Sequence, residues 1–355
     1  MGKEKAIEIP VVDNFSRVKP RRLSWLWPNR IPLGKMSLLV GIGGVGKSFL
    51  SLYMAAQVST GRPWIDGRNE TREPASVFVL TAEDDIEDTV VIRLKAAGAN
   101  LDKVYFIKAI KSEGQERGLY NLTSDGILLW QAVRQVPDTK LVIIDPISAY
   151  MEGKNENKNA EVREFLSPLI SMAQTEKLAV LGISHLNKNQ EQAAINRVIG
   201  SAAFINAVRA AWLVQTDRDD IDRRLFVHLK GNLGVKPTGL AYRLMAQSVM
   251  TEDGLEGSAY CAFEPGLLDI TADELLAPGE RKKGRPSKRD DAGDWLLDFL
   301  TDGPRDARVI MSAGRDEGYS QRTLERAKKR LDIQSIKMPD DNGLSNHWEW
   351  ALPTY

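Results

Sequence analysis

The chain has 355 residues, of which 43% are hydrophobic, so it is long enough for one large domain with a buried core and a smaller module. Its 48 Lys and Arg residues balance 48 Asp and Glu residues, which excludes a global field that would draw the whole molecule onto nucleic acid or an anionic membrane. The single cysteine, Cys261, excludes an intramolecular disulfide and a cysteine-based metal cluster, and it fits a reducing cytosol.

The beginning of the chain carries no targeting pattern that we recognise. Residues 1–10 are charged and lack the apolar centre of a signal peptide, and Ala6 stands where a myristoylation site needs Ser or Thr. No apolar run approaches the roughly 20 residues that span a bilayer. We therefore expect a cytoplasmic protein without a membrane partner.

Residues 17–277 alternate short apolar runs with longer amphipathic ones, which is typical of parallel strands joined by helices. The predicted strands are residues 36–40, 77–81, 104–109, 141–145 and 178–184. The predicted helices between them are residues 49–58, 87–97, 124–136 and 161–175. A further helix over 201–208 and strands over 210–215, 225–230 and 241–245 would extend the sheet at one edge. These patterns predict an α/β fold with a mostly parallel central sheet.

The composition changes abruptly near residue 278, which separates the chain into four predicted segments. They are a tail (1–16), the α/β domain (17–277), a basic linker (278–291) and a small domain (292–355). In the small domain we expect helices over 294–300, 305–317 and 321–331, followed by strands over 333–338 and 347–351. Asp341, Asn342 and Gly343 would form the turn between these strands. Three helices followed by a hairpin describe a winged helix-turn-helix.

A glycine-rich loop follows the first strand and opens the first helix. It consists of Gly41, Ile42, Gly43, Gly44, Val45, Gly46, Lys47 and Ser48, and Phe49 follows it. Glycines let backbone N–H groups surround phosphate oxygens, and the helix directs the positive end of its dipole at them. Lys47 would reach the β- and γ-phosphates and Ser48 would bind Mg²⁺. The pattern predicts an ATP site; a plain turn between strand and helix is the alternative, but such a turn has no need of Lys-Ser.

Two acidic positions follow neighbouring strands, where ligands of open α/β sheets bind. Asp145 ends the apolar run 141–145 and would act on the Mg²⁺ shell through water, although Asp is also a common turn former. Glu83 follows the run 77–81 and is our candidate general base for the attacking water. Glu83, Asp84 and Asp85 could instead cap the next helix. The two interpretations are compatible if Asp84 or Asp85 caps the next helix while Glu83 acts as the general base.

Three further polar residues complete the predicted catalytic set. His185 follows the strand 178–184 and would hydrogen-bond the γ-phosphate, unless it is only a surface histidine at a strand end. Arg209 and Lys230 lie far along the domain, and we predict that they act on the nucleotide of a neighbouring subunit. Surface salt bridges are the alternative for these two cations.

With these residues identified, residues up to about 275 resemble the RecA-like ATPases of replicative helicases. The greatest similarity is to the RepA-type hexameric helicases of plasmids, phages and other mobile elements, which are described as AAA-family ATPases. The matching positions, in order, are Gly41 to Ser48, Ala82 to Asp84, Ile143 to Pro146, Ser184 and His185, Gly200 and Ser201, Val208 and Arg209, and Lys230 to Asn232. Ile199 stands where members often carry Arg, with Arg197 two residues earlier. The resemblance implies Mg-ATP as cofactor, a homo-oligomeric ring, a hexamer, and translocation on single-stranded DNA.

The C-terminal region is similar to the small winged-helix modules appended to such ATPases. Arg322, Arg326 and Lys329 lie on its predicted third helix, and a basic helix of this kind enters a major groove of duplex DNA. Binding of a protein by this helix is the alternative. Arg285, within Lys-Gly-Arg-Pro, resembles the core of an AT-hook that inserts into a narrow minor groove. A solvated linker is the simpler interpretation of that segment.

The sequence therefore predicts an ATP-hydrolysing DNA motor, a RepA- or DnaB-like replicative helicase of a phage, plasmid or integrated element. Its partners would be single- or double-stranded DNA and a replication initiator or primase. The alternative is an ATP-gated DNA-binding regulator or loader that does not unwind DNA. A small-molecule kinase would need an Arg-rich lid and an acceptor pocket, for which the sequence offers no candidates.

Overall fold

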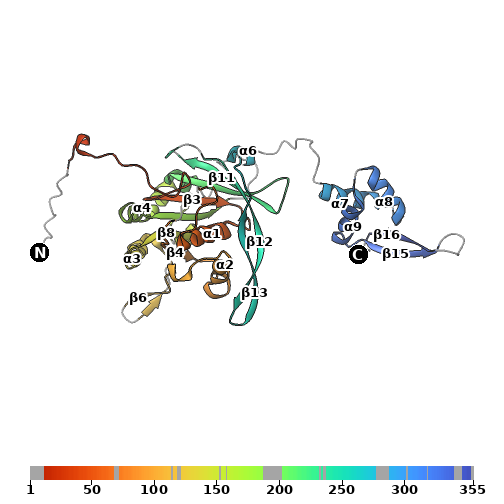
Figure 1. The fold of residues 1–355 in the computed structure, drawn as a ribbon, viewed down its shortest axis with the longest axis horizontal. Coiled ribbons are helices and arrows are strands. Elements are labelled where there is room, and N and C mark those ends of the chain that lie inside the picture. The colour runs from red at the N-terminus through yellow and green to blue at the C-terminus, as the bar shows by residue number, and fades with distance from the viewer. Residues whose placement is uncertain are drawn as a thin grey trace. The chain divides into compact units, whose positions relative to one another are not determined.

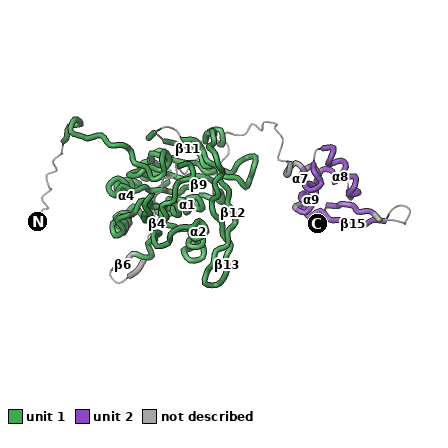
Figure 2. The backbone as a smooth tube through the Cα atoms, viewed as in Figure 1, with its two compact units in different colours: residues 1–278 green, residues 279–355 purple. Residues whose placement is uncertain are grey.

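The structure of the chain is a computed structural model. It describes residues 12–67, 72–112, 115–117, 121–151, 153–156, 158–186, 202–231, 233–234, 237–276, 288–300, 303–317, 319–339 and 346–352. The chain forms two compact units, residues 1–278 and residues 279–355, which Figure 2 shows in different colours.

A large mixed sheet forms the centre of the first unit. Within the described residues it has nine strands, in the order β13-β12-β11-β10-β3-β9-β8-β4-β5. Their bounds are β3 (Lys35–Gly41), β4 (Ser76–Thr81), β5 (Val104–Tyr105), β8 (Thr139–Asp145), β9 (Ala179–His185), β10 (Ala210–Thr216), β11 (Arg223–Gly231), β12 (Leu240–Thr251) and β13 (Gly254–Phe263). The strands from β10 to β5 are parallel, whereas β11, β12 and β13 pair antiparallel. The predicted α/β class with a mostly parallel sheet is confirmed.

Helices cover both faces of this sheet (Figure 1). They are α1 (Lys47–Thr60), α2 (Val91–Ala96), α3 (Leu122–Arg134), α4 (Asn159–Glu176), α5 (Ala202–Ala207) and α6 (Ala272–Leu276). One apolar core lies between the sheet and α3, α4, α5 and α6, and a second lies between the sheet and α1 and α2. Met36 and Leu38 of β3 belong to the first core and Leu39 belongs to the second. Because both faces are buried, β3 appears in the sequence as a continuous apolar run.

Shorter elements connect these parts. They are η1 (Phe15–Arg17), β1 (Trp25–Trp27), β2 (Ile31–Pro32), the π-helical η2 (Ile86–Val90), η3 (Leu101–Lys103), β6 (Ile110–Ser112), β7 (Gln115–Arg117) and η4 (Ile147–Tyr150). The predicted strand over 104–109 extends only to Tyr105, which pairs with Phe78 of β4. The predicted helix over 87–97 is divided between η2 and α2.

The hairpin of β12 and β13 differs most from the sequence prediction, which placed a strand only at 241–245. The two strands pair from Tyr242 with Phe263 to Thr251 with Gly254, and Figure 1 shows them as a long hairpin at one edge of the sheet. Gly254 has φ of 125°, which favours glycine at this tight turn. Much of the outer hairpin is exposed, so its strands lack the apolar run that marks a buried strand.

The second unit contains three helices and a three-stranded antiparallel sheet within its described residues. Its elements are α7 (Lys288–Phe299), β14 (Arg305–Asp306), α8 (Ala307–Asp316), α9 (Gln321–Arg330), β15 (Gln334–Pro339) and β16 (Asn346–Ala351). The sheet order is β14-β16-β15, and Leu296, Ile310, Leu324 and Trp350 lie in one core.

Two boundaries in this unit differ from the sequence prediction. α7 begins at Lys288, inside the segment interpreted as a linker. The helix predicted from residue 305 begins at Ala307, because Arg305 and Asp306 pair with β16 instead. The predicted turn at 341–343 lies outside the described residues.

Candidate nucleotide site

The glycine-rich loop joins the end of β3 to the start of α1. Gly46 precedes α1 with φ of 94° and ψ of 22°, a left-handed conformation that side chains other than glycine adopt at a cost. A Cβ atom on Gly41 would lie 2.4 Å from the carbonyl oxygen of Val214, so a side chain has no room there. The glycines let the loop turn back over the end of β3. The free N–H groups of the first turn of α1 then face the position that a phosphate would take.

Lys47 is buried beneath this loop, with 4% of its surface exposed. Its Nζ donates hydrogen bonds to the carbonyl oxygens of Gly41 (3.0 Å) and Ile42 (2.9 Å) and lies 3.2 Å from Nδ1 of His185. Burial lowers the pKa of the Lys47 ammonium to about 8, although the negative charges of Asp145 and Glu83 oppose this shift. These hydrogen bonds hold the amino group at the loop.

Asp145 ends β8 and lies next to Ser48, with which it forms a side-chain hydrogen bond. Burial raises the pKa of the Asp145 carboxyl, and the charges of Glu83 and Asp84 act in the same direction. The hydrogen bond to Ser48 and the charge of Lys47 oppose that shift. A hydroxyl and a carboxylate side by side are the hard oxygen donors that Mg²⁺ takes together with phosphate oxygens and water. These two residues therefore fit the predicted magnesium site.

His185 ends β9, which lies between β3 and β8 in the sheet. This strand order places His185 between the phosphate loop and Asp145 at the carboxyl edge. Its Nε2 lies 3.8 Å from Oε1 of Glu83, whose side chain is 61% exposed. The structure thus brings Lys47, Ser48, Glu83, Asp145 and His185 together at one edge of the sheet. Their individual catalytic roles stay predictions.

The acidic residues after β4 have different surroundings. Asp85 is the N-cap of η2, and its carboxylate accepts hydrogen bonds from the backbone N–H groups of Glu87 and Asp88. Asp84 forms an ion pair with Arg93 at 2.6 Å, and the Arg93 guanidinium lies 4.8 Å from the ring centre of Phe49. Capping therefore occupies Asp85 and an ion pair occupies Asp84, while Glu83 lies toward His185.

Tyr242 of β12 is a contact to the loop that the sequence analysis missed. Its side chain is fully buried, and its hydroxyl donates a hydrogen bond to the Gly46 carbonyl oxygen at 3.3 Å. Leu244 lies beside it, 3.3 Å from the position of a Cβ on Gly46. The contact joins residues 196 positions apart, and a tyrosine within an apolar strand gives no local signal of it.

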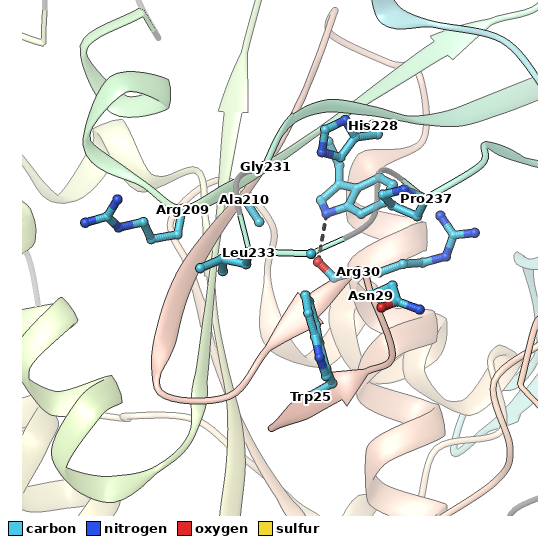
Figure 3. Close-up of a pocket in the computed structure, with 11 residues that line it drawn as sticks. Trp25, Asn29, Arg30, Arg209, Ala210, His228, Gly231, Leu233 and Pro237 are labelled. Atoms are coloured by element: carbon cyan, nitrogen blue, oxygen red, sulfur yellow. Dashed lines mark hydrogen bonds between the residues drawn. The ribbon is translucent and has the colours of Figure 1, made fainter. Parts of the chain in front are cut away.

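Arg209 and Lys230 lie away from this site. Arg209 precedes β10, whose Ala210 pairs with Ser37, four positions before the loop begins at Gly41. Arg209, Arg30 and His228 all line one small pocket, and Figure 3 shows the Arg209 guanidinium pointing away from the other two. Lys230 donates hydrogen bonds to the carbonyl oxygens of Ile205 (2.6 Å) and Asn206 (3.2 Å). Burial lowers the pKa of Lys230, and the charge of Arg209 adds to the shift. Within the chain, neither cation belongs to the cluster around Lys47.

The predicted nucleic-acid residues are placed only in part. Arg322, Arg326 and Lys329 are exposed on α9, and their spacing of four and three residues puts them on one face of that helix. Leu324 and Ala327 face the core from the other side. Arg285 lies outside the described residues, as do Arg197, Ile199 and Asn232.

Two further findings concern membrane-spanning helices and the family of the chain. In the part of the chain that the structure describes, no helix is long and apolar enough to cross a membrane. A family model described as AAA domain matches residues 3–191, which is more than half of the chain. The match includes the phosphate loop, Glu83, Asp145 and His185. It ends before Arg209, Lys230 and the second compact unit.

Proposed function

Because the chain belongs to the AAA domain family, we propose that it hydrolyses ATP and uses the energy to move on DNA, as a RepA- or DnaB-like helicase. The arrangement of Lys47, His185 and Glu83 beside the Ser48–Asp145 pair supports this proposal most strongly. The cluster combines a glycine-rich loop, a buried cation, a neighbouring hydroxyl and carboxylate that suit Mg²⁺, and the exposed carboxylate of Glu83 beside His185.

The residues of this cluster divide the work of hydrolysis. The loop N–H groups and Lys47 bind the phosphates and stabilise the charge that develops on them. Glu83 orients a water and accepts its proton as the water oxygen bonds to the γ-phosphorus and the bond to the ADP oxygen breaks. His185, within reach of both Lys47 and Glu83, hydrogen-bonds the γ-phosphate. Mg²⁺ held near Ser48 and Asp145 would neutralise phosphate charge. The products are ADP and phosphate.

We further propose that the subunits form a ring, a hexamer, in which Arg209 and Lys230 face the nucleotide of a neighbour. Both residues lie away from their own phosphate loop, and Arg209 has no hydrogen bond or ion pair among the described residues. Head-to-tail contacts close into rings when the rotation between subunits permits it. Negative-stain imaging with Mg²⁺ and a non-hydrolysable ATP analogue tests this assembly. The ring would be contradicted if the protein, diluted until it is monomeric, hydrolysed ATP at the same rate per molecule as it does when concentrated.

Phosphate release with and without single-stranded DNA, together with strand displacement on forked duplexes, tests the motor function. A helicase shows DNA-stimulated hydrolysis and separates the strands in one polarity. Stimulated hydrolysis without unwinding in either polarity would instead support an ATP-gated DNA-binding regulator or loader. The separate second unit with its basic helix gives that alternative physical support. For the helicase and for the regulator alike, we propose a replication initiator or primase as the protein partner that recruits the chain to DNA.

We propose that the second unit is a winged-helix module that binds duplex DNA through α9. Arg322, Arg326 and Lys329 have no acidic partner within the described residues, and cations on one helix face suit phosphates along a groove. Replacing all three by Ala should reduce the slope of log affinity against log salt by about three. Arg315→Ala, which removes an exposed charge from α8, is the matched control. Unchanged duplex affinity in the triple variant would indicate a surface for protein instead.

A further inference from the structure

A polar hollow of about 390 Å³ lies beside Arg209, between α4 and the end of α5. From α4 it is lined by Arg163, Ser167 and Ser171, which are four residues apart and so share one helix face. Arg209 and Lys230 line the other side. Residues from two helices and two strand ends thus converge on one space, although no sequence motif links them.

The hollow is strongly positive. Its lining includes Arg163, Arg209 and Lys230 and has no carboxylate. The acidic neighbours of Arg163 on α4 are engaged elsewhere: Glu161 pairs with Lys158 at 3.0 Å and Glu164 pairs with Lys154 at 2.8 Å. Within the described residues, Arg163 and Arg209 form no hydrogen bond or ion pair. Two arginines therefore offer unused donors to one space.

The nucleotide site lacks what the hollow contains. Lys47 is already bonded to two carbonyl oxygens, and Arg93, close to the same loop, is paired with Asp84. Among the described residues, no other arginine forms an ion pair or hydrogen bond with this cluster. Phosphoryl transfer in such sites gains from an arginine on the equatorial oxygens, supplied by the same chain or by a neighbour. The positive charge of the hollow is therefore complementary to the negative charge of a triphosphate bound in the nucleotide site.

We propose that Arg163 is a second cation that acts, with Arg209, on the triphosphate bound by a neighbouring copy of this chain. The inference rests on the proposed function and adds a residue from α4 to it. Ser167 and Ser171 would donate hydroxyl hydrogen bonds to the same phosphate oxygens. The lining has no aromatic side chain on which a nucleobase could stack, so the hollow suits phosphate better than single-stranded DNA.

Mixing two inactive variants tests the proposal directly. Lys47→Ala removes the ammonium group of the phosphate loop but leaves the hollow intact, whereas Arg163→Gln removes a cation of the hollow but leaves the loop intact. Arg163→Gln alone should lower kcat roughly 10²-fold, as expected for one lost transition-state donor. In a ring mixed at equal amounts, about a quarter of the interfaces combine an intact loop with an intact hollow, so activity should recover toward that fraction. Lys108→Ala, which removes an exposed charge outside the hollow, should keep the wild-type rate.

Each outcome of the mixing experiment decides one question. Hydrolysis by Lys47→Ala would overturn the proposed function itself. An inactive Lys47→Ala with a wild-type rate in Arg163→Gln would overturn only the role of Arg163. If Arg163→Gln lost activity and mixing did not restore it, Arg163 would act within its own subunit or would only stabilise the fold, and its proposed role toward a neighbour would be overturned. Intact basal hydrolysis with lost DNA affinity would assign the hollow to nucleic acid. Arg163→Lys should retain part of the rate, since it keeps the charge but not the planar fork.

Discussion

The carboxyl edge of the sheet and the hollow at α4 and α5 hold positive charge in opposite ways. Lys47 at the edge is buried and donates hydrogen bonds to two carbonyl oxygens of its own chain. Arg163 and Arg209 in the hollow are exposed and have no bonded partner among the described residues. A buried cation must be satisfied within its own chain, whereas an exposed one can serve a molecule from outside. On the proposed account, each subunit of the ring would carry a complete binding loop and would need cations from a neighbour to complete its catalytic site.

Removing the buried cation should have the largest effect. Lys47→Ala deletes the charge at the β- and γ-phosphates, and we expect ATP hydrolysis to fall by about 10³-fold or more. Phosphate release measures it. Lys35→Ala, at the other end of β3, is the control and should hydrolyse ATP normally. If Lys47→Ala and Lys35→Ala hydrolysed ATP at equal rates, the Lys47 ammonium would have no role in hydrolysis.

Glu83→Gln should separate binding from turnover. The amide keeps the shape of the side chain but cannot accept the proton of the attacking water, so kcat should fall roughly 10²- to 10⁴-fold while ATP still binds. Single-turnover hydrolysis and the affinity for a fluorescent ATP analogue measure the two effects. Glu87→Gln alters an exposed neighbour and should change neither. A wild-type rate in Glu83→Gln would exclude Glu83 as the general base.

Nucleotide affinity should depend on pH near the lowered pKa of Lys47. In the free protein the ammonium loses its proton as the pH rises through about 8, and a bound triphosphate raises the pKa again. Affinity should therefore be constant well below pH 8 and fall above it, by up to about tenfold per pH unit. Titration of an ATP analogue from pH 7 to 9.5 measures this. Arg163 and Arg209 stay charged throughout, so Lys47→Ala should show a flat profile. An equally steep profile in that variant would contradict the assignment.

The smallest effect should come from the support of the loop by Tyr242. Tyr242→Phe leaves the Gly46 carbonyl without its hydroxyl partner at a cost of about 1 kcal/mol, which corresponds to a fall in Tm of about 2–4 °C. Thermal denaturation with and without nucleotide measures it. Tyr260→Phe, on the neighbouring β13, is the control. Equal melting temperatures for the two variants would show that the hydrogen bond does not stabilise the loop.

The centre of the fold could be predicted from the sequence because its signals are local. The buried strands β3, β8 and β9 are continuous apolar runs, and their carboxyl ends carry the loop, Asp145 and His185. The rule that ligands bind beyond the carboxyl ends of parallel strands then placed these side chains together. The structure bears out their proximity.

The features that escaped prediction depend on pairing across long stretches of chain. The β12–β13 hairpin is largely exposed, so burial imposes no apolar pattern on its outer half. The pairing of Arg305 with Trp350 overrides the helical pattern that begins there. Arg163 is an ordinary surface arginine in the sequence, and only the packing of α4 beside α5 shows what it faces.

A crystal structure with Mg²⁺ and a non-hydrolysable ATP analogue tests the central claim most directly. We expect the triphosphate within the loop from Gly41 to Ser48, the metal ion at Ser48 near Asp145, and Glu83 facing the γ-phosphate. An empty loop, or carboxylates of Asp145 and Glu83 directed away from the bound nucleotide, would contradict the account.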